Sequence, residues 1–454
     1  MKASFSSICI TPRTGLPLAG NGREDSASRG VHDHLYANMA YLEAGKSRLL
    51  FIGLDLLGIK KEDCDEIKRL LLKRCGLKEE EIILFATHTH SGPNTVEIFK
   101  CFLTEADEEA CRGYRKWLIN EIAATAPEVL AKTEEMQMGY SRDVVEGCSF
   151  NRRVLLRDGT LRMVFEAYDP ADIERLAGPN GNPVMSVLAW RDAFERVRGA
   201  LVHFTSHPAI VCGDAWLYSR DYIDALTVEI QKRYGPDTVV LYANGAQGNL
   251  VAADPYKPFV TGFEEAARVG KLLAEGAIKM IDRMALYDTG YKKDWAIQAA
   301  VAPVWLPIRQ MKREDMQRAK KLLAGGGEGV MLHGLDPRAE GESILEFAQY
   351  AKKEERSVIQ AIRLDDVIIA TFPGELFFEY ARTAMSGVAT GFVIGLANDY
   401  VGYIPTKEAF LQGGYEVKTS YASSRFAPEA GDILVKETKA LIKNLQENPP
   451  KEGR

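Results

Sequence analysis

Two short stretches of this sequence, ATHTHSGPN and HFTSHPAI, hold the histidines best placed for metal chemistry. In the first, His88 and His90 follow residues 82–86, which we expect to form a buried strand. Ligand crevices of α/β sheets open at the carboxyl ends of strands, and in an extended chain residues i and i+2 point to the same side. We therefore predict that one histidine binds a metal while the other faces a substrate. The alternative is a pair of polar turn residues.

The second stretch ends in a histidine-proline pair. Pro208 restricts His207 to extended geometry, so we expect His203, Thr205 and His207 to share one face of a strand. A lone histidine on an apolar strand is usually a core residue, which is our interpretation of His203. His207, at the end of the strand, is the better candidate for a metal ligand.

Two imidazoles suit zinc, which takes three or four N, O or S ligands and keeps one position open in catalytic sites. An anionic oxygen ligand is therefore expected as well. Glu375, in FPGELF, follows an apolar strand and a Pro-Gly turn, where a carboxylate can project into a cleft. The alternative is that Glu375 stabilises the first turn of a helix, which we expect from residue 375 to about residue 385.

Two further loops contain polar side chains that could face a ligand. LANDYVGYIPT places Asn398, Asp399, Tyr400 and Tyr403 among glycine and proline, although a tyrosine in such a loop is usually a packing residue. NGAQGN, residues 244–249, ends a strand, and its glycines let backbone amides approach a ligand. The sequence has no G-K-[ST] phosphate loop, no G-x-G-x-x-G after a strand and no G-x-S-x-G. This argues against a nucleotide site and against an α/β-hydrolase triad.

Short apolar runs alternate with longer amphipathic ones along the chain, which is the pattern of βαβ units. Four amphipathic helices are expected, over residues 62–76, 222–234, 263–284 and 430–446. The first should end at Gly76. VIQAIRLDDVIIATF is typical of a hairpin that turns at Asp365 and Asp366. The expected fold class is therefore α/β, with mixed β-sheets flanked by helices.

Composition restricts the class of protein. Of the 454 residues, 46% are hydrophobic and 26% charged, as in an ordinary folded enzyme, and the net charge of −6 is too small to indicate a nucleic-acid partner. Seven cysteines without a C-x-x-C pair indicate reduced thiols. The N-terminus has no apolar signal region, and the most apolar run, residues 49–59, is too short to span a membrane. We therefore expect a cytoplasmic protein, without stable membrane insertion, folded as one catalytic unit over residues 1–454.

Together these motifs resemble the N-terminal catalytic domain of the neutral/alkaline non-lysosomal ceramidases, zinc amidases that release a fatty acid from a sphingoid base. The matching segments are, in order, ICITP with Gly20, GVHDHLYA, THTHSGP, NRR at 151–153, SHPA, NGAQGN, PGEL and NDYVGYIPT, followed by GGYE at 413–416. The resemblance covers most of residues 5–425, and THTHSGP with N-x-Y-x-x-Y-I-x-T is a specific pair.

The resemblance implies a ceramidase-like fold, one zinc ion per chain and roles for individual residues. The implied metal ligands are His88, His207, Glu375 and Tyr403. The implied catalytic residues, which face the substrate, are His90, Arg152 and Tyr415. We expect further substrate contacts at Gly20, Asn244, Gln247 and Asn249.

The sequence also departs from the family pattern. The family carries a serine, sometimes assigned as a nucleophile, in a G-D-V-S-P-N segment, and aligning its glycine with Gly248 puts Val251 at that position. We find no secretion signal, no counterpart of the C-terminal immunoglobulin-like domain, and KEAFLQGGYE in place of the E-E-Y-x-x-Q run. These departures favour a substrate smaller than ceramide.

The predicted activity is hydrolysis of a linear amide, an N-acyl bond, by a zinc-activated water, on a small or lipid-like N-acyl substrate. His90 would move the proton to the leaving amine, Arg152 would hold a polar or anionic group, and Tyr415 would polarise the carbonyl.

Three alternatives remain open. One is hydrolysis of a non-ceramide ester, lactone or small amide. Another is a non-catalytic metal-binding or ligand-binding homologue, which Val251 would favour. The third is a TIM-barrel amidohydrolase, but there the His-x-His motif lies on the first barrel strand, whereas here it follows about 87 residues.

Overall fold

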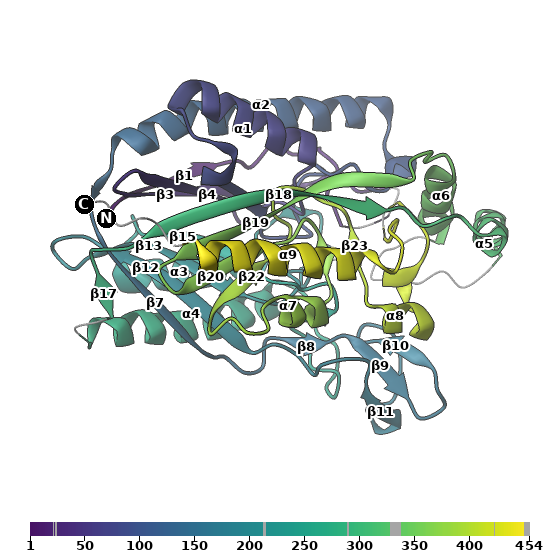
Figure 1. The fold of residues 1–454 in the computed structure, drawn as a ribbon. Coiled ribbons are helices and arrows are strands. Elements are labelled where there is room, and N and C mark those ends of the chain that lie inside the picture. The colour runs from purple at the N-terminus through teal and green to yellow at the C-terminus, as the bar shows by residue number, and fades with distance from the viewer. Residues whose placement is uncertain are drawn as a thin grey trace.

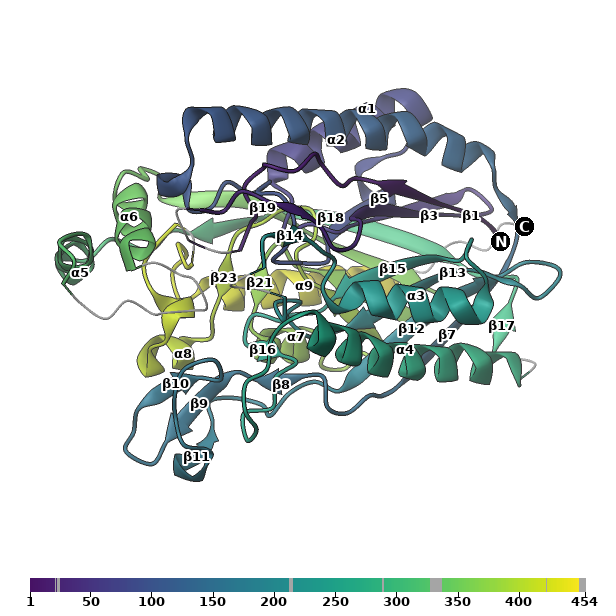
Figure 2. The same ribbon diagram turned by 180° about the vertical axis from the view of Figure 1, so that it is seen from behind.

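Three β-sheets surround a common apolar core, and helices cover their outer faces (Figures 1 and 2). All three sheets contribute buried side chains to this core, for example Phe85, Trp190 and Ile362. The computed structural model describes residues 1–20, 22, 25–211, 215–287, 290–326, 337–421 and 423–448. Cys212 and His333 lie outside these residues. The predicted α/β class, with mixed sheets flanked by helices, is confirmed.

The first sheet carries the strand that leads to His88. In spatial order its strands are β5 (Ile82–Ala86), β4 (Ser47–Leu54), β3 (Tyr36–Ala44), β1 (Lys2–Cys9) and β6 (Glu134–Glu135). Only β4 and β5 pair in parallel. Helices α1 (Lys61–Cys75) and α2 (Glu105–Ala131) cover its outer face at the top of Figure 1.

The second sheet leads to His207. Its order is β15 (Val239–Asn244), β13 (Val197–Phe204), β12 (Val184–Arg191), β7 (Gln137–Val144) and β17 (Tyr291–Lys292). Here β13 and β15 are parallel, and α3 (Tyr222–Tyr234) and α4 (Phe263–Ala285) pack on the outer face, as Figure 2 shows. The apolar residues of both helices recur at helical spacing, and this periodicity explains why their predicted positions are confirmed.

The third sheet leads to Glu375. Its order is β18 (Ile297–Pro307), β19 (Glu354–Leu364), β20 (Val367–Thr371) and β22 (Thr390–Ile394). The hairpin β19–β20 turns at Asp365 and Asp366, as predicted, and Asp365 has φ 53°. Helices α7 (Phe378–Ala384) and α9 (Ala430–Glu447) cover this sheet, whereas α5 (Arg313–Leu323) and α6 (Pro337–Ala348) lie together at one end of the molecule in both views.

Short strands join the segments between the sheets. These are β2 (Gly30–Val31) with β14 (Leu217–Tyr218), β8 (Phe150–Asn151) with β16 (Leu250–Val251), β21 (Glu375–Leu376) with β23 (Tyr403–Ile404), and β9 (Arg153–Leu156) with β10 (Leu161–Met163) and β11 (Ile173–Leu176). The separate mixed sheets exclude the TIM-barrel alternative, which needs eight parallel strands closed into one barrel. No described helix is both long enough and apolar enough to span a membrane.

The predicted first residue of the helix, Glu375, is wrong. Glu375 lies in β21, and α7 begins three residues later, at Phe378. The Glu375 amide donates to the carbonyl of Gly402 (2.9 Å), and Phe377 N donates to the carbonyl of Ile404 (3.1 Å). Because these backbone amides bond to β23, residues 375 and 376 are held in a strand, and the helix begins only after them.

Helix α1 ends as predicted at Gly76, which has φ 65° and donates its amide to Leu72 O (3.0 Å). No atom lies within 4 Å of a Cβ added there, so the cost of a side chain is conformational only. We expect Gly76→Ala to lower the free energy of unfolding by about 1–2 kcal/mol, measured by urea denaturation. Gly113 is the matched control, because it also has open space but lies inside α2. There, Gly113→Ala should raise stability by about 0.5–1 kcal/mol. Equal effects of both variants would contradict this account.

Candidate metal centre and active site

His88 lies just beyond the end of β5, in a loop held to the neighbouring chain. Thr87 N donates to Leu54 O (2.9 Å), and His88 N donates to Leu56 O (2.9 Å). The backbone of His88 is left-handed, with φ 74°, so the extended geometry predicted for the two histidines is wrong. The turn brings the His88 and His90 rings to 5.0 Å, edge to face, instead of setting them side by side along a strand.

The second stretch also departs from its predicted geometry. Strand β13 ends at Phe204, and His207 lies in the following loop, where it forms an isolated bridge with Val251. His203 remains in the strand, where it is buried and stacks on Phe392 with ring centroids 4.6 Å apart. Its interpretation as a core residue is confirmed. His203, Thr205 and His207 therefore do not form one strand face.

His88, His207 and Glu375 converge on one point, although more than 280 residues separate the first from the last. His88 Nε2 lies 3.2 Å from His207 Nε2 and 3.2 Å from Glu375 Oε2, and His207 Nε2 lies 3.0 Å from the same oxygen. All three side chains are buried. Two ligand atoms bound about 2.0–2.1 Å from a tetrahedral zinc ion lie roughly 3.3 Å apart, so the spacing fits that ion.

Hydrogen bonds at Nδ1 determine which nitrogen of each ring faces the site. His88 Nδ1 lies 2.7 Å from Leu57 O, and His207 Nδ1 lies 2.9 Å from Gln247 O. A carbonyl oxygen only accepts, so both Nδ1 atoms carry the proton. Both Nε2 atoms face each other and a carboxylate oxygen, and each presents a lone pair when its ring carries only the Nδ1 proton. Three acceptors at these distances repel one another unless a cation lies between them.

Two of the three side chains, His207 and Glu375, have shifted pKa values. Burial lowers the pKa of His207 to about 4, so the ring is neutral at pH 7. Burial alone would raise the pKa of Glu375, but the neighbouring His88 and His207 hold that pKa well below its usual value. At pH 7 the site therefore offers the neutral imidazole of His207 and the carboxylate of Glu375, two groups that zinc accepts as ligands.

Tyr400 contacts the second oxygen of the same carboxylate. Its hydroxyl donates to Glu375 Oε1 (2.8 Å), and the hydroxyl is buried. Glu375 Oε2 thus faces the histidines while Oε1 is held by Tyr400. This role of Tyr400 is not evident from the sequence, where a tyrosine in such a loop is interpreted as a packing residue. The motif N-x-Y-x-x-Y could have indicated this role, because two tyrosines in one polar loop each bring a hydroxyl that needs a hydrogen-bond partner.

Tyr403 is placed by the backbone pairing of β23 with β21, in register with Glu375. Its hydroxyl lies 3.2 Å from that of Tyr415, and its ring lies over His207 with centroids 6.4 Å apart. Burial, together with Glu375, raises its pKa well above the usual value. The structure thus brings Tyr403 to the site, and its role as a fourth ligand stays a prediction.

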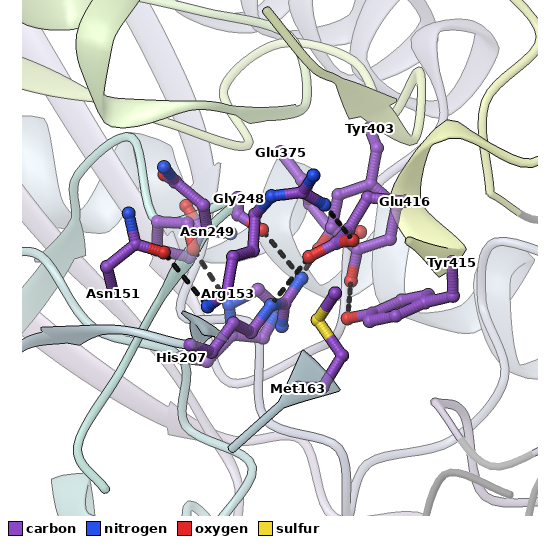
Figure 3. Close-up of polar contacts among 12 residues, drawn as sticks. Asn151, Arg153, Met163, His207, Gly248, Asn249, Glu375, Tyr403, Tyr415 and Glu416 are labelled. Atoms are coloured by element: carbon purple, nitrogen blue, oxygen red, sulfur yellow. Dashed lines mark hydrogen bonds and ion pairs between the residues drawn. The ribbon is translucent and has the colours of Figure 1, made fainter. Parts of the chain in front are cut away.

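Arg152 and Arg153 share one buried carboxylate, Glu416, and Figure 3 labels Arg153 and Glu416. Arg152 Nε donates to Glu416 Oε1 (3.1 Å), Arg153 Nη1 donates to Oε2 (2.8 Å), and Arg152 Nη2 donates to Gly248 O (2.6 Å). The Arg152 guanidinium also lies over the ring of Tyr415, at 5.0 Å. These contacts fix Arg152 and Tyr415 beside the candidate metal site, as Figure 3 shows for Tyr415 and Glu416.

His90 is the third histidine of the cluster: one nitrogen each from His88, His90 and His207 lies within 4.8 Å of the others. Its Nε2 has no hydrogen-bond partner among the described residues. Burial lowers the pKa of His90 well below 6.5, and the two other histidines lower it further. Gly20 faces it: with φ 85°, a Cβ there would lie 2.6 Å from His90 Nδ1, so only glycine leaves room for the ring. His90 therefore has a free nitrogen to accept a proton.

The other predicted substrate contacts are placed differently. Asn244 Nδ2 donates to Ser206 O (3.0 Å) and Thr87 O (3.2 Å), and so joins the two histidine loops. Asn249 Nδ2 donates to Glu379 Oε2 (3.0 Å). Gln247 is buried and holds His207 through its backbone carbonyl. These contacts position the loops, and direct substrate binding by the three side chains stays a prediction.

A cavity opens onto these residues, and the residues that line it fall into three groups, which we call the base, the apolar wall and the polar wall. Its base includes Gly20, His88, His90, Arg152, His207, Glu375, Tyr400, Tyr403 and Tyr415. Its apolar wall includes Leu57, Ile98, Phe99, Phe165, Ile210, Val251 and Phe259. Its polar wall includes Glu340, Ser343, Lys418, Ser420 and Ser423. Val251 thus puts an aliphatic side chain on the wall where the family serine was expected.

The neutral, buried state of His203 gives a pH prediction. Burial lowers its pKa to about 4, whereas the unfolded chain has a pKa near 6.5. As the pH falls below 6.5, the unfolded chain binds a proton at His203 while the folded chain does not. The contribution of His203 to the free energy of unfolding is therefore fully present above pH 6.5 and decreases until about pH 4. We expect the loss to be roughly 3 kcal/mol.

The measurement is denaturant unfolding at pH 7 and pH 4.5 for the natural chain and for His203→Leu. Because Asp55 and Asp221 have pKa values raised to about 7 by burial and act in the opposite direction, only the difference between the two chains isolates His203. A pH dependence that is the same in both chains would contradict the prediction.

Solved structures of known proteins share the fold of this chain. No model of a known protein family matches the chain. The crystal structure of neutral ceramidase from Pseudomonas aeruginosa matches 99% of this chain and 75% of its own, with a TM-score of 0.71 and 18% identity. A ceramidase complexed with C2 gives a TM-score of 0.71 and 17% identity over 100% of this chain and 76% of its own. The ceramidase-like fold predicted from the sequence resemblance is confirmed.

Proposed function

We propose that this protein is a zinc-dependent hydrolase of linear amides that cleaves N-acyl bonds with an activated water. The observation that carries the proposal is the set of three facing acceptors, His88 Nε2, His207 Nε2 and Glu375 Oε2. These residues would hold the ion, with Tyr403 as the fourth ligand. A bound zinc ion would supply a nucleophile at neutral pH, because it lowers the pKa of water from 15.7 to about 7.

The remaining steps belong to side chains of this chain. His90 has a free Nε2, so it would accept the proton of the attacking water there, and its lowered pKa favours passing that proton on to the leaving amine. Tyr415 would donate its hydroxyl hydrogen to the carbonyl oxygen of the scissile amide. Arg152 would keep positive charge beside that oxygen, since Tyr415 and Glu416 hold its guanidinium in place. A water mechanism needs no serine at position 251.

The fold of the ceramidases supports an amide as the bond cleaved, and the mixed apolar and polar walls of the cavity support an amphipathic N-acyl substrate. The test is zinc analysis of the purified protein together with hydrolysis of a panel of N-acyl amides and matched esters. About one zinc ion per chain with amide cleavage supports the proposal. Zinc without turnover on either panel would instead support a non-catalytic binding protein, and cleavage of esters alone would support the esterase alternative.

Tyr400 offers a prediction about zinc affinity. We expect Tyr400→Phe to weaken zinc binding about 10–100-fold, because it removes the hydrogen bond that orients Glu375. The affinity is measured by competition with a chromophoric chelator. Tyr380→Phe is the control: its hydroxyl is also buried, but Tyr380 lies on α7 and packs against Gly431. Unchanged affinity in Tyr400→Phe would mean that Tyr400 only packs.

A further inference from the structure

The polar wall of the cavity carries an ion-pair cluster that the proposed mechanism does not use. Lys418 Nζ donates to Glu340 Oε2 (3.0 Å), and Arg318 Nε donates to Glu340 Oε1 (2.6 Å). Glu340 comes from α6 and Arg318 from α5, whereas Lys418 follows the short turn Tyr415–Val417. Lys418 and Glu340 both line the cavity.

Lys418 keeps unused hydrogen-bonding capacity. An ammonium has three N–H donors, and in the described part of the chain Glu340 is the one hydrogen-bond acceptor of its Nζ. Burial lowers the pKa of Lys418, and Glu340 counteracts that effect. The side chain is 20% exposed, so it still reaches the space of the cavity.

Cations outnumber acids in two buried clusters beside the cavity. Each of its two buried carboxylate clusters contains one acid and two cations, Glu416 with Arg152 and Arg153, and Glu340 with Arg318 and Lys418. Glu265, also on the wall, is neutralised by Arg268 (2.6 Å). Glu166 also raises the pKa of Lys418, but less than Glu340 does. At the base of the cavity Glu375 adds a negative charge, so the excess of cations is local to the two clusters. On the polar wall this excess lies at Lys418, where it attracts an anionic group of a ligand.

The position of Lys418 suggests which part of a substrate it meets. Its backbone amide donates to Tyr415 O (3.1 Å), so it lies one turn beyond the residue that faces the scissile carbonyl. Ser420 and Ser423 follow it on the same wall and add hydroxyl groups suited to carboxylate oxygens. The apolar wall is formed by other segments and includes Phe165, Phe259 and Ile210.

We propose that the substrate is an N-acyl amino acid, with its acyl chain along the apolar wall and its carboxylate bound by Lys418. This inference rests on the proposed function, because it names the substrate class of the same site. Glu340 then has a defined part: it holds Lys418 in place and competes with the substrate carboxylate for the same ammonium.

The test compares two substrates that differ only in charge, N-octanoylglycine and N-octanoylglycinamide, by the release of octanoate. The measured quantity is the ratio of their kcat/KM values. We expect the natural chain to favour the anionic substrate. Lys418→Met should lower the ratio at least about 10-fold, as expected for the loss of one charge-assisted hydrogen bond. Glu340→Gln should raise the ratio, because it removes the competing carboxylate. Lys436→Met, which changes an 83% exposed lysine on α9, should leave the ratio unchanged.

The opposite signs separate substrate binding from a structural ion pair. If Lys418→Met and Glu340→Gln both lower kcat/KM equally for the two substrates, the pair is structural and the inference is wrong. An unchanged ratio in Lys418→Met, with both amides cleaved, also overturns the inference but leaves the proposed function intact. Cleavage of neither amide by the zinc-loaded natural chain overturns the proposed function, and the inference with it.

Discussion

Replacing His88 with alanine is expected to abolish zinc binding and amide hydrolysis together. The substitution removes one of the three proposed zinc ligands. Only the imidazole of His207 and the carboxylate of Glu375 then remain to hold the ion. Loss of a residue that only orients a metal ligand costs about 10–100-fold in affinity or activity, so loss of a ligand itself should exceed about 100-fold in both. The measurements are zinc content after dialysis and the rate of hydrolysis of the best amide of the panel.

The matched control is His203→Leu, which also removes a buried histidine but from the packing against Phe392. It should keep about one zinc ion per chain and most of the activity. Circular dichroism and thermal unfolding check that both variants fold. Full activity in a folded His88→Ala protein would rule out the metal mechanism, and equal loss of zinc in both variants would show a general effect on folding.

The second large effect is expected from Glu416→Gln, in the stability of the protein. Glu416 is fully buried and is shared by Arg152 and Arg153, whose side chains are 3% and 0% exposed. The amide keeps the shape but loses the charge, so two buried guanidinium groups remain without a compensating anion. Breaking a buried ion pair in this way costs about 3–5 kcal/mol, measured as the free energy of unfolding in urea at pH 7.

Two further variants sharpen this experiment. Glu437→Gln, on α9, changes a carboxylate that is 42% exposed and should cost less than about 1 kcal/mol. Combining Glu416→Gln with Arg153→Met should recover part of the loss, because it removes one uncompensated charge. If Glu416→Gln costs no more than Glu437→Gln, the buried cluster contributes little to stability.

The regular elements of the fold could be predicted wherever the side-chain pattern alone decides them. Residues 82–86 are apolar throughout and form β5, and the periodic segment Tyr222–Tyr234 forms α3 within the predicted bounds. The turn at Asp365 and the end of α1 at Gly76 are likewise local, because each depends on the backbone conformation of one or two residues. Such features need no knowledge of distant parts of the chain.

The candidate site depends on distant partners, and there local patterns were insufficient. Glu375 is drawn into a strand by Gly402, and His88 takes a left-handed backbone in a loop bonded to Leu56. Asn249 directs its amide to Glu379, 130 residues away. The motif resemblance identified His88, His207 and Glu375 as a group, which the structure brings together. It did not identify Tyr400, Glu416 or Lys418, because only the folded neighbourhood shows what their polar atoms reach.

The parallel pairing of β21 with β23 has a consequence for biosynthesis. Tyr403 is more than three hundred residues downstream of His88, so at 5–20 residues per second it is made roughly 15–60 s later. Glu375 receives its β23 partner only then. Once residue 207 has been made, the growing chain carries both histidines but not yet the backbone that aligns the carboxylate with them. The complete binding geometry therefore forms near the end of translation, and productive zinc loading should follow ribosomal synthesis rather than accompany it.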